Sequence, residues 1–221
     1  SLAPKSMSLT DRYTASVQSS PEVRAFLHAL QLASGETVTL MRLEEHEVVV
    51  TTILGGSRPG SHPGLYVGLS GPAHAFAAGR VLLAGLPAAQ REDAIARSHR
   101  PSSLPWFPAC SEQALRDDLA RIQQQGYAVD HGEGSQGVCC LAAPVCWTAG
   151  ETVAIAIMAP CSRFLRDEVR LLPVLLEVAR SISALNALPA PDPGWQASDQ
   201  VAQSTIEAAQ AAIADAMSRV T

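Results

Sequence analysis

Residues 137–160, GVCCLAAPVCWTAGETVAIAIMAP, contain two nearly apolar runs separated by a polar break at 148–151. The break includes Gly150, which permits the positive φ of a tight turn, and the second run is rich in Val and Ile. This pattern predicts a β-hairpin at the centre of a sheet. Because neither run alternates strictly between apolar and polar positions, we expect both its faces to be covered, by helices on one side and by a cavity or a partner on the other.

A second hairpin is predicted nearer the N-terminus. The runs 37–43 and 48–54 are rich in β-branched residues, and the charged residues between them are typical of a turn in water. The segment 55–64 is too rich in Gly and Pro for regular structure, and we expect 65–69 to return as a short strand. Another short strand is expected at 127–129.

Helical periodicity predicts the remaining elements. The expected helices are 20–34, 72–86, 87–97, 112–125, 171–185 and 200–220. Ser111 is suited to cap the fourth of these and Gly126 to end it. Pro173 lacks a backbone N–H, so we expect the fifth helix to begin beside it.

Hairpins and helices in this order predict an α+β fold with a central, mainly antiparallel sheet flanked by helices, plus a C-terminal helical arm. We expect one domain at 20–188, preceded by a leader or linker remnant at 1–19. Residues 189–221 are expected to form a Pro-rich linker and the C-terminal helix.

The chain has 221 residues and a net charge of −5, with its basic residues dispersed. This charge argues against direct coating of nucleic acid, and no apolar run reaches the length of a membrane span. The five cysteines are odd in number and lie mostly in predicted buried strands. We therefore expect free thiols and a cytoplasmic location.

Motifs for nucleotide binding, metal ligation or known cofactors are absent, so no cofactor or metal is expected. Cys140 could be a thiol nucleophile, since a base and an orienting acid could come from His131, His74 and Asp130. A redox sensor or thiol enzyme centred on Cys140 is therefore one alternative, and structural thiols in a strand are the other. Cys139 and Cys140 point to opposite faces of a strand and cannot serve one site.

The front of the predicted helix 72–86 is a candidate binding site. Free N–H groups and the positive dipole end attract a carboxylate or phosphate, and Ala77, Ala78 and Gly79 permit close approach. The same small residues would equally allow a helix to pack closely on a sheet.

Four segments occur in a specific order: 72–87 (PAHAFAAGRVLLAGLP), 115–133 (LRDDLARIQQQGYAVDHGE), 137–145 (GVCCLAAPV) and 154–160 (AIAIMAP). Together they resemble the effector-binding domain of IclR-family transcriptional regulators. The resemblance implies a GAF-like domain that binds a small metabolite, often a short or aromatic carboxylic acid, and no enzymatic activity. It also implies homodimers or homotetramers that act on DNA.

The resemblance places the effector between the small-residue helix and the sheet. It implies these effector-binding residues: Ala77, Ala78, Gly79, Asp130, Val138, Cys140, Ala156, Met158 and Leu54. Ala156 and Met158 stand where some members have pocket hydroxyls, so we expect a largely apolar or aromatic acid. Asp130 would accept a hydrogen bond from a hydroxyl or amine of the ligand, or take up a proton.

The family normally carries an N-terminal winged helix, and nothing before Ser20 can form one. Either this sequence is a fragment of a longer regulator, which we expect, or this homologue has lost its winged helix. DNA would be a partner only through that winged helix, and this chain alone would not bind duplex DNA specifically.

Overall fold

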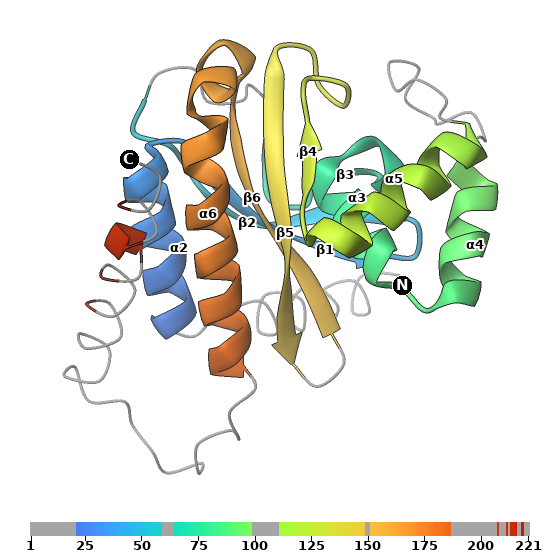
Figure 1. The fold of residues 1–221 in the computed structure, drawn as a ribbon, viewed down its shortest axis with the longest axis horizontal. Helices are drawn as coiled ribbons and strands as arrows, with labels where there is room; N and C mark the ends of the chain where they lie inside the picture. Colours follow the sequence, from blue (N-terminus) through green and yellow to red (C-terminus); the bar gives the residue numbers. More distant parts are fainter. Residues whose placement is uncertain are drawn as a thin grey trace, which may run out of the picture.

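The computed structural model describes residues 21–58, 64–98, 111–148 and 151–186, with six residues nearer the C-terminus: Glu207, Ala211, Ile213, Ala214, Asp215 and Ser218. Within these residues, an antiparallel sheet has helices packed on both faces (Figure 1). This arrangement confirms the α+β fold. The leader at 1–19, the loop at 100–110 and most of the C-terminal arm lie outside the described residues.

Six strands form the sheet: β1 (Thr37–Glu44), β2 (Glu47–Leu54), β3 (Ser70–Pro72), β4 (Ala128–Asp130), β5 (Val138–Thr148) and β6 (Glu151–Pro160). Their order is β3-β2-β1-β6-β5-β4, and all neighbours are antiparallel. Both predicted hairpins are confirmed. The strand expected at 65–69 is wrong, because Gly64 and Gly68 have positive φ there and the third strand begins only at Ser70.

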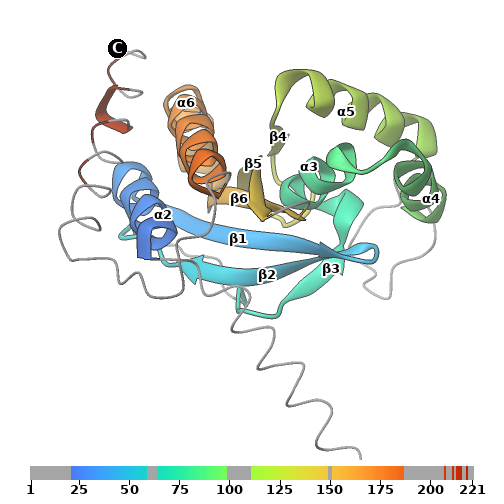
Figure 2. The same ribbon diagram turned by 90° about the horizontal axis from the view of Figure 1, so that it is seen from below.

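The helices are α2 (Pro21–Ser34), α3 (Ala77–Gly85), α4 (Ala88–Ser98), α5 (Glu112–Gln125) and α6 (Cys161–Asn186), with a 3₁₀ turn η1 (Ala73–Ala75) before α3. Figures 1 and 2 show α2 and α6 side by side on one face of the sheet, with α3, α4 and α5 on the other. The predicted ends of α5 are confirmed, since Ser111 Oγ accepts from Ala114 N (3.1 Å) and Gly126 is left-handed.

Each face of the sheet has its own core. Leu141, Ile155 and Ile157 pack with the inner faces of α2 and α6. On the opposite face Ala142, Ala154 and Ala156 lie against α3, whose first residues are also small. Small side chains on both surfaces let α3 approach the sheet closely, so the packing explanation of the small residues holds here. Ile213 is buried in the core on the α2 and α6 side.

Two helix starts differ from expectation. The helix expected at 72–86 is divided, because η1 ends before Phe76 and α3 begins only at Ala77. The helix expected at 171–185 begins ten residues earlier, at Cys161, and contains Pro173 in its interior. Pro173 cannot donate a hydrogen bond to the carbonyl of Val169, four residues earlier. Val169 is 77% exposed, so water can satisfy that carbonyl.

The expectation that the cysteines are free is wrong for two of them. Cys139 and Cys161 form a disulfide between β5 and the start of α6, with their Cα atoms 4.9 Å apart. Cys140 is free and buried, and Cys146 is free and exposed. Adjacent strand residues point to opposite faces, which is why Cys139 meets α6 and Cys140 does not.

Among the described residues, no helix is both long enough and apolar enough to cross a bilayer.

Candidate functional site

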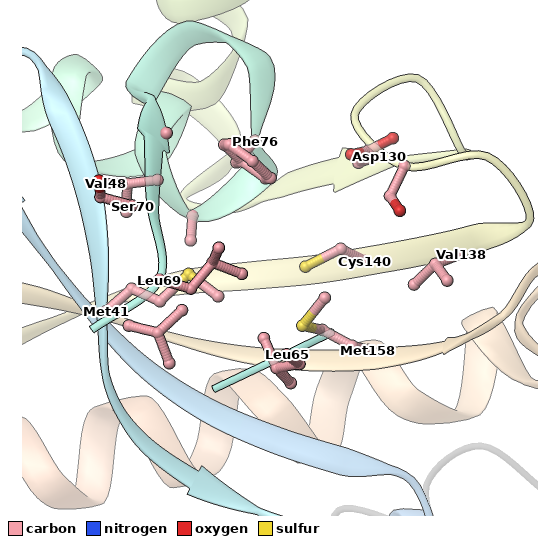
Figure 3. Close-up of a pocket in the computed structure, with 14 residues that line it drawn as sticks. Met41, Val48, Leu65, Leu69, Ser70, Phe76, Asp130, Val138, Cys140 and Met158 are labelled. Carbon is pink, nitrogen blue, oxygen red and sulfur yellow. The ribbon is translucent and has the colours of Figure 1, made fainter. Parts of the chain in front are cut away.

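A cavity of about 40 Å³ lies on the α3 face of the sheet (Figure 3). Strands β1, β2, β5 and β6 form its floor, and the segment before β3, together with the start of α3, covers it. Its lining residues are Met41, Val48, Val50, Leu65, Leu69, Ser70, Gly71, Phe76, Ala78, Asp130, Ser135, Val138, Cys140 and Met158. Most are apolar, so the few polar groups decide what orientation a bound molecule would take.

The N-terminus of α3 forms one wall of this cavity. Arg80 N donates the first helical hydrogen bond to Phe76 O (2.9 Å), so the N–H groups of Ala77, Ala78 and Gly79 have no acceptor inside the helix. No side chain caps this turn, and it carries no acidic residue. The partial positive charge of the helix therefore lies beside the cavity, which Ala78 lines.

Asp130 forms another wall and is 3% exposed. Its Oδ1 accepts the backbone N–H groups of Gly132 (2.9 Å), Glu133 (2.7 Å) and Gly134 (3.3 Å). Its Oδ2 accepts from Gly134 at 3.2 Å. The carboxylate therefore fixes the loop after β4, while Oδ2 retains capacity for one further donor.

The loop after β4 packs closely against η1. A Cβ placed on Gly134 would lie 2.5 Å from Ala75 O, so only glycine fits at this contact. Because η1 precedes the first turn of α3, the loop and the helix N-terminus support each other at the cavity.

The structure brings five of the predicted site residues to the cavity: Ala78, Asp130, Val138, Cys140 and Met158. Ala77 and Gly79 are buried beside it in the first turn of α3, and Ala156 is buried on the same face of the sheet.

Leu54 is placed elsewhere, and its assignment to the lining is corrected. A bulge in the β1–β2 pairing leaves Thr51 as an extra residue, because Leu40 pairs with Thr52 and Met41 with Val50. One extra residue exchanges the faces of the strand beyond it. Leu54 therefore packs on the α2 and α6 core.

The thiol site considered from the sequence is not assembled. Burial and the negative charge of Asp130 raise the pKa of Cys140 far above that of an ordinary thiol. His131 Nε2 lies 3.1 Å from Glu168 Oε2 on α6, and its ring meets Phe164 edge-on, on the other side of the sheet from Cys140. His131 is therefore not placed to activate Cys140.

The sequence reasoning missed the apolar lining from β1, β2 and the segment before β3: Met41, Val48, Val50, Leu65, Leu69 and Phe76. Alternation along 37–50 could have indicated Met41, Val48 and Val50, because residues two apart share a face. It also missed Thr39, which is fully buried on the Met41 face and whose Oγ1 has no hydrogen-bond partner among the described residues.

Arg80 links α3 to the elements that surround the cavity. Its guanidinium reaches Asp118 Oδ2 (3.2 Å), Val129 O (2.8 Å) and Glu133 Oε2 (3.4 Å), which joins α3 to α5 and to the loop after β4. Burial and the charge of Arg80 lower the pKa of His74 below its ordinary value. His74 is therefore neutral at neutral pH.

A larger hollow, of about 550 Å³, lies between the β1–β2 turn and α4. His46 lies in it, with its side chain 41% exposed and Nε2 3.8 Å from Asp93 Oδ2. No group of three or more His, Cys, Asp or Glu among the described residues is placed to hold a metal ion.

The fold and the cavity define a class: an α+β domain with an antiparallel sheet and a mostly apolar cavity beside a helix N-terminus. The chain belongs to the IclR family of bacterial transcriptional regulators. Residues 12–184 match the model of the "Bacterial transcriptional regulator IclR C-terminal".

Two curated relatives are regulators of known name. The HTH-type transcriptional regulator Rv1719 of Mycobacterium tuberculosis is 32% identical over 167 residues, which are 74% of this chain and 62% of that protein. The DNA-binding transcriptional repressor YiaJ of Escherichia coli is 29% identical over 160 residues, 71% of this chain and 57% of that protein. The chain thus spans about 60% of these relatives, which are named as regulators and not as enzymes.

Solved structures have the same fold. A transcriptional regulator named YaiJ has a TM-score of 0.65 and 27% identity, over 74% of this chain and 92% of that one. A regulator from Rhodococcus has a TM-score of 0.71 and 24% identity, over 84% of this chain and 76% of that one.

Proposed function

We propose that this domain binds a small carboxylic acid in the cavity beside α3 and transmits its binding to a DNA-binding domain of the same regulator. The observation that carries the proposal is the position of Ala78, in the uncapped first turn of α3 and on the cavity wall. A carboxylate there would accept the free N–H groups and interact favourably with the helix dipole.

The charge of Asp130 restricts what else the ligand carries. A ligand carboxylate is repelled by this group, so the two would bind at different ends of the cavity. The loop amides already occupy Oδ1, and Oδ2 would accept from a hydroxyl or an amine of the ligand. A hydroxylated or amino-bearing acid fits these requirements.

The apolar lining favours a ligand with a hydrophobic body. Each Å² of apolar surface that it buries contributes roughly 25 cal/mol. The cavity of about 40 Å³ holds only a few water molecules, so an aromatic acid would have to displace Met41 or Met158, or the segment 64–69. Methionine side chains repack easily, and Tyr66 and Val67 in that segment are exposed.

A thermal-shift screen tests the proposal. Aromatic and medium-chain hydroxy or amino acids are compared with pyruvate and glyoxylate, and a ligand at 100 times its Kd should add about 2.7 kcal/mol of stability. We expect the larger acids to give the larger shift. A greater shift with pyruvate than with every aromatic acid would contradict the expected ligand class.

Variants locate the site. Ala78→Trp should abolish the shift by filling the cavity, and Ala96→Trp, on the exposed side of α4, is the matched control. Should Ala78→Trp fail to fold, Val138→Phe at the partly exposed edge of the lining replaces it. A response that survives these cavity substitutions would show that the ligand binds elsewhere.

DNA binding is proposed to reside in a winged helix outside the described domain, as the helix-turn-helix names of the relatives suggest. With a net charge of −5, this chain alone should give no sequence-specific mobility shift with duplex DNA at physiological salt. A shift that survives competitor DNA would overturn this assignment. We also propose a cytoplasmic location, in keeping with a regulator of transcription.

A further inference from the structure

We infer that Cys139 and Cys161 are a reversible redox pair that fixes the loop at 131–137 and, through it, one wall of the cavity. The bond joins β5 to the first residue of α6, with a Cα separation of 4.9 Å. Disulfides span roughly 4.4–6.8 Å between Cα atoms, so this separation is an ordinary one for the bond. The effect on a ligand rests on the proposed function, but the redox pair does not.

The kind of protein argues for a reversible bond. Transcriptional regulators act where thiol reductants keep most cysteines reduced, and disulfides that form there are usually transient or redox-sensing. Cys140 does not compete for the bond, since it lies on the other face of the sheet. Cys146 is free and exposed, and it provides an internal comparison.

The two thiols have different surroundings in the reduced form. Cys161 is partly exposed at the N-terminus of a 26-residue helix, where the dipole stabilises a thiolate. Cys139 is fully buried. Cys161 is therefore the attacking sulfur and Cys139 the resolving one.

The oxidant is a peroxide. The Cys161 thiolate attacks one peroxide oxygen, the O–O bond breaks, and the leaving oxygen takes a proton to depart as water or alcohol, which leaves a sulfenic acid. Cys139 then attacks the Cys161 sulfur and gives up its own proton, the S–O bond breaks, and water leaves as the disulfide forms. A dithiol returns two electrons and two protons by exchange and is itself oxidised to a disulfide.

The outer side of the loop rests on the disulfide and on α6. A Cβ placed on Gly132 would lie 3.2 Å from Cys161 Sγ, and this sulfur lies 3.9 Å from His131 O. The His131 ring contacts Phe164 edge-on and pairs with Glu168. Movement of the Cys161 side chain on reduction therefore reaches the loop directly.

The inner side of the loop faces the cavity. The amides of Gly132, Glu133 and Gly134 hold the Asp130 carboxylate, and Gly134 presses on Ala75 before α3. The loop thus lies between the disulfide and two walls of the cavity. Reduction should loosen these hydrogen bonds and change the position of Asp130.

Cysteine labelling tests the redox pair. The 221-residue chain is reduced with dithiothreitol under native conditions, exposed to hydrogen peroxide, quenched, denatured and alkylated, and its peptides are mapped by mass spectrometry. We expect the 139 and 161 peptides to be alkylated after reduction and cross-linked after peroxide, in wild type and in the Cys146→Ser control. A bond that native dithiothreitol does not open, or that peroxide does not restore, overturns the inference.

Hydrogen exchange tests the coupling. In reduced wild type, and in Cys161→Ser if it folds, amides at 132–134 should exchange roughly tenfold faster than in the oxidised protein, while those of β1 stay unchanged. Equal exchange at 132–134 in both redox forms would refute the coupling. If an acid stabilises the oxidised form more than the reduced form, the redox state also changes ligand binding in the cavity. Failure of every acid to stabilise either form counts against the proposed function alone.

Discussion

At the residue scale, Cys140 shows how the surroundings of a thiol decide its role. It lies in the cavity wall near Asp130, and burial together with that negative charge raises its pKa. A protonated thiol is a poor nucleophile, so Cys140 acts as a small apolar side chain in the cavity wall.

Alkylation at neutral pH measures this difference. In the folded protein we expect iodoacetamide to modify the exposed Cys146 at least about a hundredfold faster than Cys140, since the thiolate is the reacting species. Denaturation should remove the difference between these two residues. If Cys140 in the native state were labelled as fast as Cys146, Cys140 would be a reactive thiol and not only a packing residue.

The lowered pKa of His74 leads us to expect that the stability of the folded protein depends on pH. Burial and the charge of Arg80 lower its pKa in the folded state, so between that value and the ordinary 6.5 the unfolded chain binds the extra proton. Its contribution to stability is therefore complete above about pH 6.5 and decreases as the pH falls. Urea unfolding at about pH 8 and pH 5 should show that His74→Gln gains relative to wild type at the lower pH. An unchanged difference between variant and wild type at the two pH values would contradict this.

At the element scale, Pro173 carries a prediction for α6. Pro173→Ala should restore the hydrogen bond to the Val169 carbonyl and remove an interior proline, which costs about 3 kcal/mol in a helix. Greater freedom of the unfolded chain offsets about 1 kcal/mol, so we expect a net gain of up to about 2 kcal/mol by chemical denaturation. A loss of stability would mean that the proline ring itself packs favourably.

Local patterns predicted the hairpins, α2 and α5, because their turns, caps and stop glycines lie directly beside these elements in the sequence. The beginning of α6 was missed because the sequence offers no cap at Cys161, where β6 passes directly into the helix and Cys161 N bonds to Gly137 O (3.0 Å). That start depends on a tertiary contact and not on the local sequence.

The candidate site was predictable only in part for similar reasons. Asp130, Val138, Cys140 and Met158 lie in strands, where alternate residues share a face, and Ala78 lies in the small-residue first turn of α3. The placement of Leu54 depends on the bulge at Thr51, which no local signal reveals. The disulfide joins residues 22 apart across a strand and a helix start, and cysteine spacing alone does not determine such pairing.

At the scale of the whole molecule, the two faces of the sheet are packed differently. The α2 and α6 side is a large apolar core, whereas the α3 side leaves the cavity. The outer surface of the α2 and α6 layer also carries exposed apolar residues: Leu32 (60%), Leu165 (62%) and Val169 (77%). Arg170 Nη1 donates to Ala33 O (3.1 Å), which brings the end of α2 beside this part of α6.

We predict that the protein self-associates through this surface. Leu165 and Val169 are one helical turn apart, so they form a continuous apolar strip that a second copy could bury by a symmetric contact. We expect light scattering at micromolar concentration to give a mass above that of the monomer, and Leu165→Glu with Val169→Glu to reduce it to the monomer mass. Val67→Glu, at a position 61% exposed on the far side of the sheet near the cavity, is the matched control and should leave the mass unchanged. A monomeric wild type would refute self-association, and an oligomer that survives the double substitution would place the contact on another surface.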